Sequence, residues 1–126
     1  MMANYYGTAG NDVTTISGSY EEAYGYGGDD RLTSTGEGNT LNGGLGNDTL
    51  EGAAADTLYG GDGNDIISGG TGTDILYGQA GDDILHGNNG DDVIQGGDGH
   101  DLMNGGAGSD TMTGDAELLA VEVKET

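Results

Sequence analysis

The chain contains no cysteine and almost no basic side chains. Without cysteine among its 126 residues, disulfide bonds are excluded and the redox compartment cannot be read. Arg31 and Lys124 are the only basic residues, against 23 acidic ones, and the formal net charge is −21. Such a chain repels phosphate groups, so nucleic acid and anionic membrane surfaces are excluded as direct partners.

Long apolar runs are also missing. No stretch approaches the ~20 apolar residues that a membrane-spanning helix needs, so membrane insertion is not expected. The N-terminal residues lack the basic and then apolar segments of a cleaved signal peptide. No window repeats apolar residues at a period of about 3.6, so helix is not predicted either.

The composition opposes folding of the chain on its own. Hydrophobic residues make up 33% of the sequence, and glycine supplies 29 residues. Ordering that many glycines costs on the order of 20 kcal/mol relative to alanine. Few apolar residues combined with a high net charge are typical of disordered chains, and like charges destabilise a compact state. Something outside the chain must therefore supply stability.

What the sequence does contain is a repeat of nine residues. Residues 60–68 read Gly-Gly-Asp-Gly-Asn-Asp-Ile-Ile-Ser, and residues 69–77 read Gly-Gly-Thr-Gly-Thr-Asp-Ile-Leu-Tyr. A fixed short period predicts a solenoid. The unit that contains Asp56 has only eight residues, and the units around Glu21 and Asn39 also depart from the pattern. The sixth positions of the twelve units hold Asp12, Glu21, Asp30, Asn39, Asp48, Asp56, Asp65, Asp74, Asp83, Asp92, Asp101 and Asp110.

Each unit divides into a turn and a short strand. The first six residues suit a turn, because glycine reaches positive φ without a steric clash and Asn88 tolerates the same conformation. Positions seven to nine suit a strand, with the eighth side chain on one face and its neighbours on the other. One strand and one turn reverse the chain, so two units form one coil. About five to six coils then stack as parallel strands.

The predicted fold class is all-β: a parallel β-roll, or β-solenoid, with two nine-residue repeats per coil. The eighth positions are large and apolar except at Thr14 and Ala23, and they face each other across a core one side chain deep. They form two rows, one of Leu32, Leu50, Ile67, Leu85 and Met103, and the other of Leu41, Leu58, Leu76, Ile94 and Met112.

The same geometry places the sixth positions in two acidic columns, one at each edge of the coil. Carboxylates ~5 Å apart repel by about 0.8 kcal/mol in water and about 3 kcal/mol at an effective dielectric of about 20, so a cation is needed between them. Calcium fits best, because it accepts six to eight oxygen ligands in irregular geometry, whereas magnesium demands an octahedron. Zinc prefers histidine or cysteine, and only His86 and His100 are of that type. The first column holds Asp12, Asp30, Asp48, Asp65, Asp83 and Asp101, and the second holds Glu21, Asn39, Asp56, Asp74, Asp92 and Asp110.

These units closely resemble the RTX, or repeats-in-toxin, calcium-binding family, whose repeat is Gly-Gly-x-Gly-x-Asp-x-(large apolar)-x. The resemblance covers about residues 7–113 and is most specific over 60–104. It implies a parallel β-roll in which Ca2+ lies between successive turns on one edge, held by both sixth-position aspartates and by turn carbonyls. The aspartates implied are Asp12, Asp30, Asp48, Asp65, Asp74, Asp83, Asp92, Asp101 and Asp110. The carbonyls implied are those of Gly60, Gly61, Gly63, Gly69, Gly70, Gly72, Gly78, Gly81, Gly87, Gly90, Gly96, Gly97, Gly99, Gly105, Gly106 and Gly108.

We therefore expect about seven or eight calcium ions, five in the first column and two or three in the second. The turns at Glu21, Asn39 and Asp56 are expected to bind calcium weakly or not at all. If the free calcium concentration is ~100 times the dissociation constant of each site, eight ions stabilise the folded state by roughly 20 kcal/mol. This offsets the free-energy cost of ordering the glycines. We expect the calcium-free chain to be unfolded and calcium to fold it.

The two ends of the chain depart from the regular repeat. We expect a roll over residues 1–115, degenerate over 1–59 and regular over 60–113, followed by a C-terminal tail, 116–126, that caps the open end or serves export. Leu119, Val121 and Val123 alternate within that tail, as in a strand. Near the N-terminus, five tyrosines are expected to fill the cap and the core, with carbohydrate stacking as the alternative. They are Tyr5, Tyr6, Tyr20, Tyr24 and Tyr26.

Positions seven and nine point outward. Ile66, Ile84 and Leu102 form an exposed stripe on one face, and Ile75 and Val93 lie on the other. β-Propensity and cross-strand packing explain these residues, and a partner surface or weak self-association is the alternative.

The predicted function is a calcium-dependent structural module of a secreted bacterial RTX protein. RTX proteins commonly leave the cell by type I secretion through an uncleaved C-terminal signal, so an extracellular location without a cleaved N-terminal signal is expected. No nucleophile–base pair is found, so the chain is not expected to be an enzyme. The alternatives are a calcium-dependent binding module for polysaccharide, ice or a cell surface, and a non-catalytic fragment of an RTX enzyme such as a metalloprotease, lipase or alginate epimerase.

Overall fold

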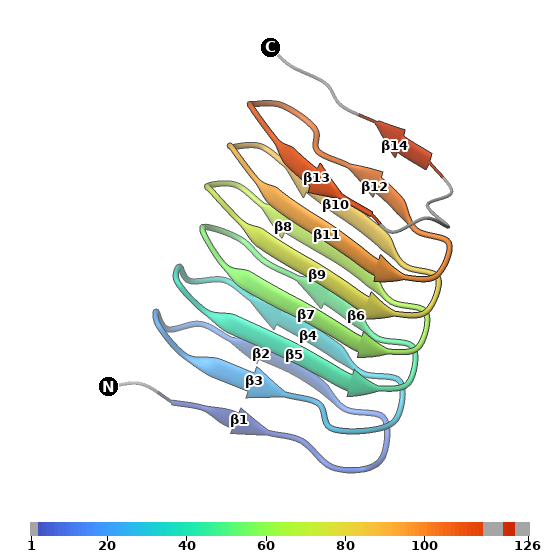
Figure 1. The fold of residues 1–126 in the computed structure, drawn as a ribbon. Coiled ribbons are helices and arrows are strands. Elements are labelled where there is room, and N and C mark those ends of the chain that lie inside the picture. Colours follow the sequence, from blue (N-terminus) through green and yellow to red (C-terminus); the bar gives the residue numbers. More distant parts are fainter. Residues whose placement is uncertain (1–2, 115–119, 123–126) are drawn as a thin grey trace.

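The computed structural model describes residues 3–114 and 120–122 and consists of strands and turns (Figure 1). Fourteen strands form two seven-stranded sheets, and the described residues contain no helix. The odd-strand sheet consists, in spatial order, of β1 (Tyr5–Tyr6), β3 (Glu22–Tyr24), β5 (Thr40–Leu45), β7 (Thr57–Asp62), β9 (Ile75–Ala80), β11 (Val93–Asp98) and β13 (Thr111–Thr113). The even-strand sheet consists of β2 (Val13–Ile16), β4 (Arg31–Ser34), β6 (Thr49–Glu51), β8 (Ile66–Gly70), β10 (Ile84–Asn88), β12 (Leu102–Asn104) and β14 (Ala120–Glu122).

The chain alternates between the two sheets, so each strand pairs in parallel with the strands two before and two after it (Figure 1). Leu76 of β9, for example, pairs with Leu58 of β7 and with Ile94 of β11. The step from Leu76 to Ile94 is 18 residues, which is two nine-residue units. The step from Leu41 to Leu58 is 17 residues, so the short unit is absorbed without loss of register. The predicted β-roll with two repeats per coil is confirmed.

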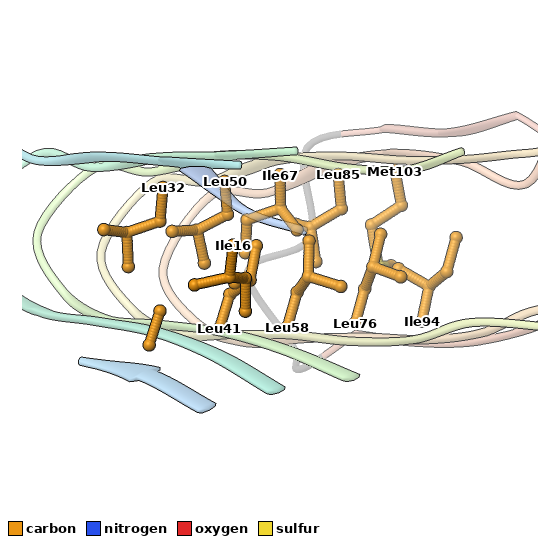
Figure 2. Packing of buried hydrophobic residues seen from close by; sticks show 11 residues of the cluster. Ile16, Leu32, Leu41, Leu50, Leu58, Ile67, Leu76, Leu85, Ile94 and Met103 are labelled. Atoms are coloured by element: carbon orange, nitrogen blue, oxygen red, sulfur yellow. The ribbon is translucent and has the colours of Figure 1, made fainter. Parts of the chain in front are cut away.

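The core is a single layer of side chains between the sheets. Figure 2 shows the eighth-position residues as two facing rows, one from each sheet. The rows have the predicted members, and all are fully buried except Met112, which is partly buried at the end of the roll. Ile16, at the end of β2, also joins this core. Burial of each large side chain contributes about 1.5–3 kcal/mol.

The turns between strands are of two kinds. In eight regular turns the second and fourth positions have positive φ, as at Gly61 (106°) and Gly63 (123°). Asn88 replaces the second glycine with φ of 75°, as predicted, and Gln79 does the same with φ of 78°. In three other turns the positive φ falls instead on the residue just before the sixth position. These closed turns, as we call them, have positive φ at Tyr20, Gly38 and Ala55, and they precede Glu21, Asn39 and Asp56.

The prediction that the N-terminal tyrosines fill the cap and the core is wrong for most of them. Tyr5 is an eighth-position residue, paired with Ala23, and it packs against the core. Tyr6, Tyr20 and Tyr26 are instead 61%, 65% and 52% exposed. The reason for Tyr6 is geometric, because it follows an eighth position and points away from a core one side chain deep. Tyr20 and Tyr26 lie between strands.

The outward stripe lies on the even-strand sheet as predicted. Ile84 of β10 pairs with Ile66 of β8 and with Leu102 of β12. Ile66 is exposed, and the other two side chains are half-buried. On the odd-strand sheet, Ile75 and Val93 are paired in the same way. No helix in the described part of the chain is long and apolar enough to cross a membrane.

The C-terminal tail contributes one strand to the roll. β14 pairs in parallel with β12, so the even-strand sheet continues past the last regular turn. Of the tail predicted over 116–126, only residues 120–122 are described. The predicted alternation of Leu119, Val121 and Val123 therefore lies largely outside the described residues.

Candidate metal sites at the turns

The two acidic columns are present, and a main-chain hydrogen bond links their neighbouring members. The N–H of each sixth-position residue donates to the side chain of the sixth position in the next coil. Asp48 N donates to Asp65 Oδ1 at 2.8 Å, and Asp65 N donates to Asp83 Oδ1 at 2.8 Å. On the opposite edge, Asp74 N donates to Asp92 Oδ1 at 2.9 Å. One oxygen of each carboxylate is thus used to hold the coils in register.

The second oxygen of most of these carboxylates has no hydrogen-bond partner. In seven of the eight regular turns the Oδ2 atom is buried without one; the residues are Asp30, Asp48, Asp65, Asp74, Asp83, Asp92 and Asp110. Asp101 occupies the same position in the remaining regular turn and is fully buried. A buried carboxylate oxygen without a partner is costly, because it has lost water and gained nothing in exchange.

The Oδ2 atoms point to the first position of their own turn. In the turn over residues 78–83, Asp83 Oδ2 and the carbonyl oxygen of Gly96, in the next coil, converge beside the Cα atom of Gly78. A Cβ atom on Gly78 would lie 2.6 Å from that carbonyl oxygen and in hard contact with Asp83 Oδ2. The first glycine of the repeat is therefore required to leave space where a carboxylate oxygen and a carbonyl oxygen meet.

The predicted carbonyl ligands all lie in these regular turns, and several of them are packed against glycines of neighbouring coils. At the fourth position, the carbonyl oxygen of Gly63 faces the Cα atom of Gly81, and that of Gly81 faces Gly99. Main-chain oxygens are thus concentrated along both edges of the roll, next to the buried carboxylates. Calcium prefers this mixture of carboxylate and carbonyl oxygens.

Burial makes these carboxylates hard to ionise in the protein alone. It raises the pKa of Asp48 and Asp83 to about 7 and the pKa of Asp65 and Asp74 to about 6. Main-chain hydrogen bonds lower these pKa values by less than burial raises them, and nearby carboxylates raise them further. Burial likewise raises the pKa of Asp92. A bound cation favours the ionised form and reverses this effect.

The three closed turns lack the free oxygen. Glu21 accepts hydrogen bonds from Ala3 N and Gly18 N, both at 3.0 Å. Asp56 Oδ2 accepts a hydrogen bond from Ala53 N at 3.2 Å. Because protein donors already satisfy these acceptors, a metal ion has much less to gain there.

Asn39, in the middle closed turn, uses its amide group in the same way. Its Nδ2 donates to Gly18 O and to Ser34 Oγ, both at 2.8 Å. Ser34 lies at the first position of this turn, where regular turns have glycine. Ile16 lies at the first position of the closed turn that precedes Glu21. Side-chain atoms therefore fill the space that the regular turns keep open.

Asp12 lies at the start of the first column but in a different environment. Its N–H donates to Asp30 Oδ1 at 2.8 Å, as the column requires. Its own Oδ2 accepts a hydrogen bond from Thr8 N at 2.7 Å, and the side chain is half-buried rather than buried. Of the nine aspartates predicted as ligands, this one is the least similar to the others.

A second ladder of hydrogen bonds, between fifth-position residues, was not predicted from the sequence. On the edge of the first column, from Asp29 to His100, the N–H of each fifth-position residue donates to the side chain of the fifth position in the previous coil. Asp29 N donates to Asn11 Oδ1 at 2.7 Å, and Asn47 N donates to Asp29 Oδ1 at 2.8 Å. His100 N donates to Asp82 Oδ1 at 2.9 Å, so this histidine serves the ladder through its main chain. The recurrence of Asn or Asp just before the sixth position was the available signal.

No three acidic or histidine side chains converge on one point within residues 3–114 and 120–122. Successive column members reach back to the previous coil rather than toward a common centre. Any metal ion at a regular turn must therefore take most of its ligands from main-chain carbonyls, with one or two carboxylates. That donor set suits calcium and does not suit zinc.

Comparison with known proteins identified one family. The model of the RTX calcium-binding nonapeptide repeat matches residues 24–54, 52–85 and 77–112, which together span more than two thirds of the chain. The matched region contains all eight regular turns. A comparison with curated proteins and one with solved structures gave no match.

Proposed function

Because the chain belongs to the RTX calcium-binding nonapeptide repeat family, we propose that it is a β-roll that folds when about seven or eight calcium ions bind at its regular turns. The observation that carries this proposal is the distribution of unsatisfied oxygens. Buried carboxylate oxygens without a partner occur in the regular turns, whereas the closed turns satisfy theirs with protein donors. The difference separates metal-binding turns from purely structural ones within a single chain.

The proposed ligands of each ion come from two consecutive coils on one edge. A sixth-position carboxylate supplies its Oδ2 atom, and first-position carbonyls from the neighbouring coil supply further oxygens. Asp65 with the carbonyl of Gly78, and Asp83 with that of Gly96, illustrate the arrangement. Calcium supplies the positive charge that lets these buried carboxylates remain ionised. The net charge of −21 becomes much less negative as the ions bind, which removes most of the self-repulsion.

The biological role that we propose is structural and responsive to calcium. Where calcium is scarce, as inside a cell, glycine entropy and charge repulsion keep the chain unfolded. Where calcium is millimolar, binding folds the roll. A chain that stays unfolded until it leaves the cell is well suited to type I secretion, so we place this module in a secreted bacterial protein and assign it no catalytic step.

Circular dichroism and titration calorimetry test the proposal. In excess chelator the spectrum is expected to be that of a disordered chain, and calcium addition is expected to produce a β spectrum with about seven or eight ions bound per molecule. Magnesium at the same concentration serves as the control and is expected to leave the chain largely unfolded. A β spectrum that is unchanged by chelator would exclude calcium-driven folding.

A further inference from the structure

Three asparagines of this chain are followed directly by glycine, and each of these bonds lies at the start of a regular turn or inside one. The bonds are Asn42–Gly43, Asn89–Gly90 and Asn104–Gly105. The closed turns, residues 16–21, 34–39 and 52–56, contain no such bond. The glycines that the regular turns require therefore give these turns a second chemical property.

An asparagine that precedes glycine can lose its side-chain amide without an enzyme. The main-chain nitrogen of the glycine gives up its proton and attacks Cγ of the asparagine, so that a C–N bond forms and a five-membered succinimide ring closes. The Cγ–Nδ2 bond breaks, and the side-chain nitrogen leaves with that proton as ammonia. Water then opens the ring at one of its two carbonyls, which gives aspartate or isoaspartate. Glycine favours the attack, because it has no Cβ atom to hinder its nitrogen and it restricts the main chain least.

The folded roll opposes ring closure at the two asparagines that lie in strands. The ring requires Cβ of the asparagine to be eclipsed with the glycine nitrogen about the Cα–C bond, whereas a parallel strand with ψ of about +115° keeps these two atoms apart. Asn42 lies in β5 and is paired with residues of β3 and β7. Asn104 ends β12 and is paired with residues of β10 and β14. Strand pairing on both sides therefore holds each of them in the extended conformation.

The glycines that follow these two asparagines are also fixed in place. Gly43 is buried beside Asp48 Oδ2, and a Cβ atom on it would lie 2.7 Å from the carbonyl oxygen of Gly60. Gly105 is buried beside Asp110 Oδ2 in the same way. Ring closure at either asparagine would displace the first glycine of a proposed metal site. A calcium ion bound at that turn therefore holds the attacking nitrogen where it cannot react.

Asn89 is protected by hydrogen bonds instead. Its side chain is exposed and it lies between strands. The attacking nitrogen, that of Gly90, donates to Ala107 O at 3.0 Å, and Asn89 N donates to Gly70 O at 3.0 Å. Since the Gly90 nitrogen must leave its acceptor before it can lose its proton, the reaction requires a local opening of the turn. We expect this exposed site to be the least protected of the three.

We propose that Asn42, Asn89 and Asn104 deamidate spontaneously while the chain is free of calcium, and that calcium-driven folding suppresses the reaction. This inference rests on the proposed function, because it takes the calcium-free chain to be unfolded. In an unfolded chain all three bonds rotate freely and their main-chain nitrogens are open to solvent. Time spent without calcium is then recorded as a covalent change in the regular turns.

The two products have different consequences for the roll. Aspartate in place of Asn89 reproduces the third-position residue of two other regular turns, Asp62 and Asp98. Isoaspartate carries the main chain through Cβ and Cγ, so it inserts one extra atom before the next residue. At Asn42 this insertion would move Gly43 out of its proposed metal site. Each isoaspartate that precedes a first-position glycine is therefore expected to remove the calcium ion of that turn.

Peptide mass spectrometry follows the reaction in the full chain at about pH 8, with one sample in excess chelator and one in saturating calcium. In water enriched in heavy oxygen, each event also incorporates a solvent oxygen, which marks the conversions that occur during the incubation. Internal controls are the asparagines that precede aspartate, whose side chain hinders the attack; they are Asn11, Asn47 and Asn64. In chelator we expect the three Asn–Gly bonds to convert well before these controls. In calcium we expect their conversion to be at least tenfold slower, with the smallest protection at Asn89.

Circular dichroism of the same samples separates two kinds of failure. If calcium produces no β spectrum, the proposed function is wrong and the protection is wrong with it. If the β spectrum appears while the Asn–Gly bonds convert as fast as in chelator, the protection alone is wrong. Conversion in chelator that is no faster than at the control asparagines would overturn the assignment of these three sites.

A triple variant tests the consequence for calcium binding. It introduces residues that the chain already has at the same positions of other regular units: Asn42→Gln as at Gln95, Asn89→Thr as at Thr71, and Asn104→Ser as at Ser68. After incubation in chelator, the unsubstituted chain is expected to bind fewer calcium ions by calorimetry than fresh protein does, whereas the variant keeps its full count. Equal losses in the two chains would show that deamidation at these sites is not the cause.

Discussion

In each regular turn the first residue lies next to the sixth-position carboxylate of the same turn. Where that residue is glycine, a carboxylate oxygen and a carbonyl oxygen share the space beside its Cα atom, as at Gly78. Where the residue has a side chain, as at Ile16 and Ser34, the turn adopts the closed conformation. The third closed turn begins with Gly52 but is one residue shorter, so the closed conformation accompanies either a side chain at the first position or the loss of one turn residue.

Replacement of a first-position glycine should remove one calcium site. In Gly78→Ala the new methyl group would meet Asp83 Oδ2 and, at 2.6 Å, Gly96 O. We expect one ion fewer by calorimetry and, at ~100 times the dissociation constant, a loss of about 2.7 kcal/mol of stability, or more if the turn distorts. Gly10→Ala is the control, since its nearest neighbour would be Thr8 Oγ1 at 3.7 Å. Equal calcium binding by both variants would argue against the space beside Gly78 as a metal site.

Replacement of the carboxylate itself should distinguish regular from closed turns. Asp83→Asn keeps an acceptor for Asp65 N but replaces Oδ2 with a donor group, so we expect it to lose at least one ion. Asp56→Asn is the matched control in a closed turn, where Ala53 N already satisfies Oδ2, and we expect the ion count to stay the same. Ion counts by calorimetry check both. A lower count in Asp56→Asn would show that the closed turns bind calcium after all.

At the scale of strands, the roll depends on a single layer of core side chains. Leu76 of β9 is fully buried and is paired with Leu58 and Ile94 on either side. Leu76→Ala is expected to lower the free energy of unfolding in calcium by about 2–5 kcal/mol, because a layer one residue deep cannot collapse around the cavity. Leu45→Ala, at a position that is 60% exposed, should change it by less than about 0.5 kcal/mol. Chemical denaturation curves compare the two.

The acidic columns predict how the calcium-free chain responds to pH. Burial raises the pKa values of Asp48 and Asp83 to about 7, above their values in the unfolded chain. The folded state therefore binds more protons than the unfolded state between about pH 4 and pH 7, so stability increases as the pH falls and is lost as it rises. In calcium-depleted buffer we expect more β structure at about pH 5 than at about pH 8, measured by circular dichroism.

A double variant controls for this pH effect. Asp48→Asn combined with Asp83→Asn places neutral side chains at two of the groups that otherwise need protons. The difference in β structure between about pH 5 and about pH 8 should become smaller in this variant, because fewer protons are taken up on folding. An unchanged difference would assign the pH response to other groups.

At the scale of the whole molecule, calcium is expected to change the size of the chain. A disordered chain of 126 residues has a radius of gyration of about 36 Å, and a compact domain of that length has one of about 14 Å. Small-angle X-ray scattering should therefore show a large contraction when calcium is added to chelator-treated protein. Sodium chloride of equal ionic strength screens charge without binding at the turns, so it should give a much smaller contraction. A compact particle in chelator would contradict this expectation.

Much of this architecture follows from the sequence, because the strand and repeat periods are strict. An 18-residue coil and the alternation within a strand place Leu58 beside Leu76 and Asp65 beside Asp83, and both neighbours occur as predicted. The closed conformation was not predictable, since it depends on how Asn39 and Ser34 satisfy the main chain of an adjacent coil. The outward position of Tyr6 follows from its place after an eighth position, whereas the expectation that aromatic side chains near the chain end fill the cap and the core disregards that alternation.

The two hydrogen-bond ladders at the first edge run in opposite directions, so every interior coil presents the same donors and acceptors to the coil before it and the coil after it. The number of residues in the roll is therefore expected to change by whole coils. An insertion of 18 residues adds a complete coil and leaves every later side chain on its original face. An insertion of nine residues moves every later strand to the opposite sheet and exchanges the two edges, which brings regular turns beside closed ones. Apart from a one-residue change inside a turn, as in the 17-residue coil from Leu41 to Leu58, lengthened or shortened variants of this protein should accordingly be tolerated in steps of whole coils.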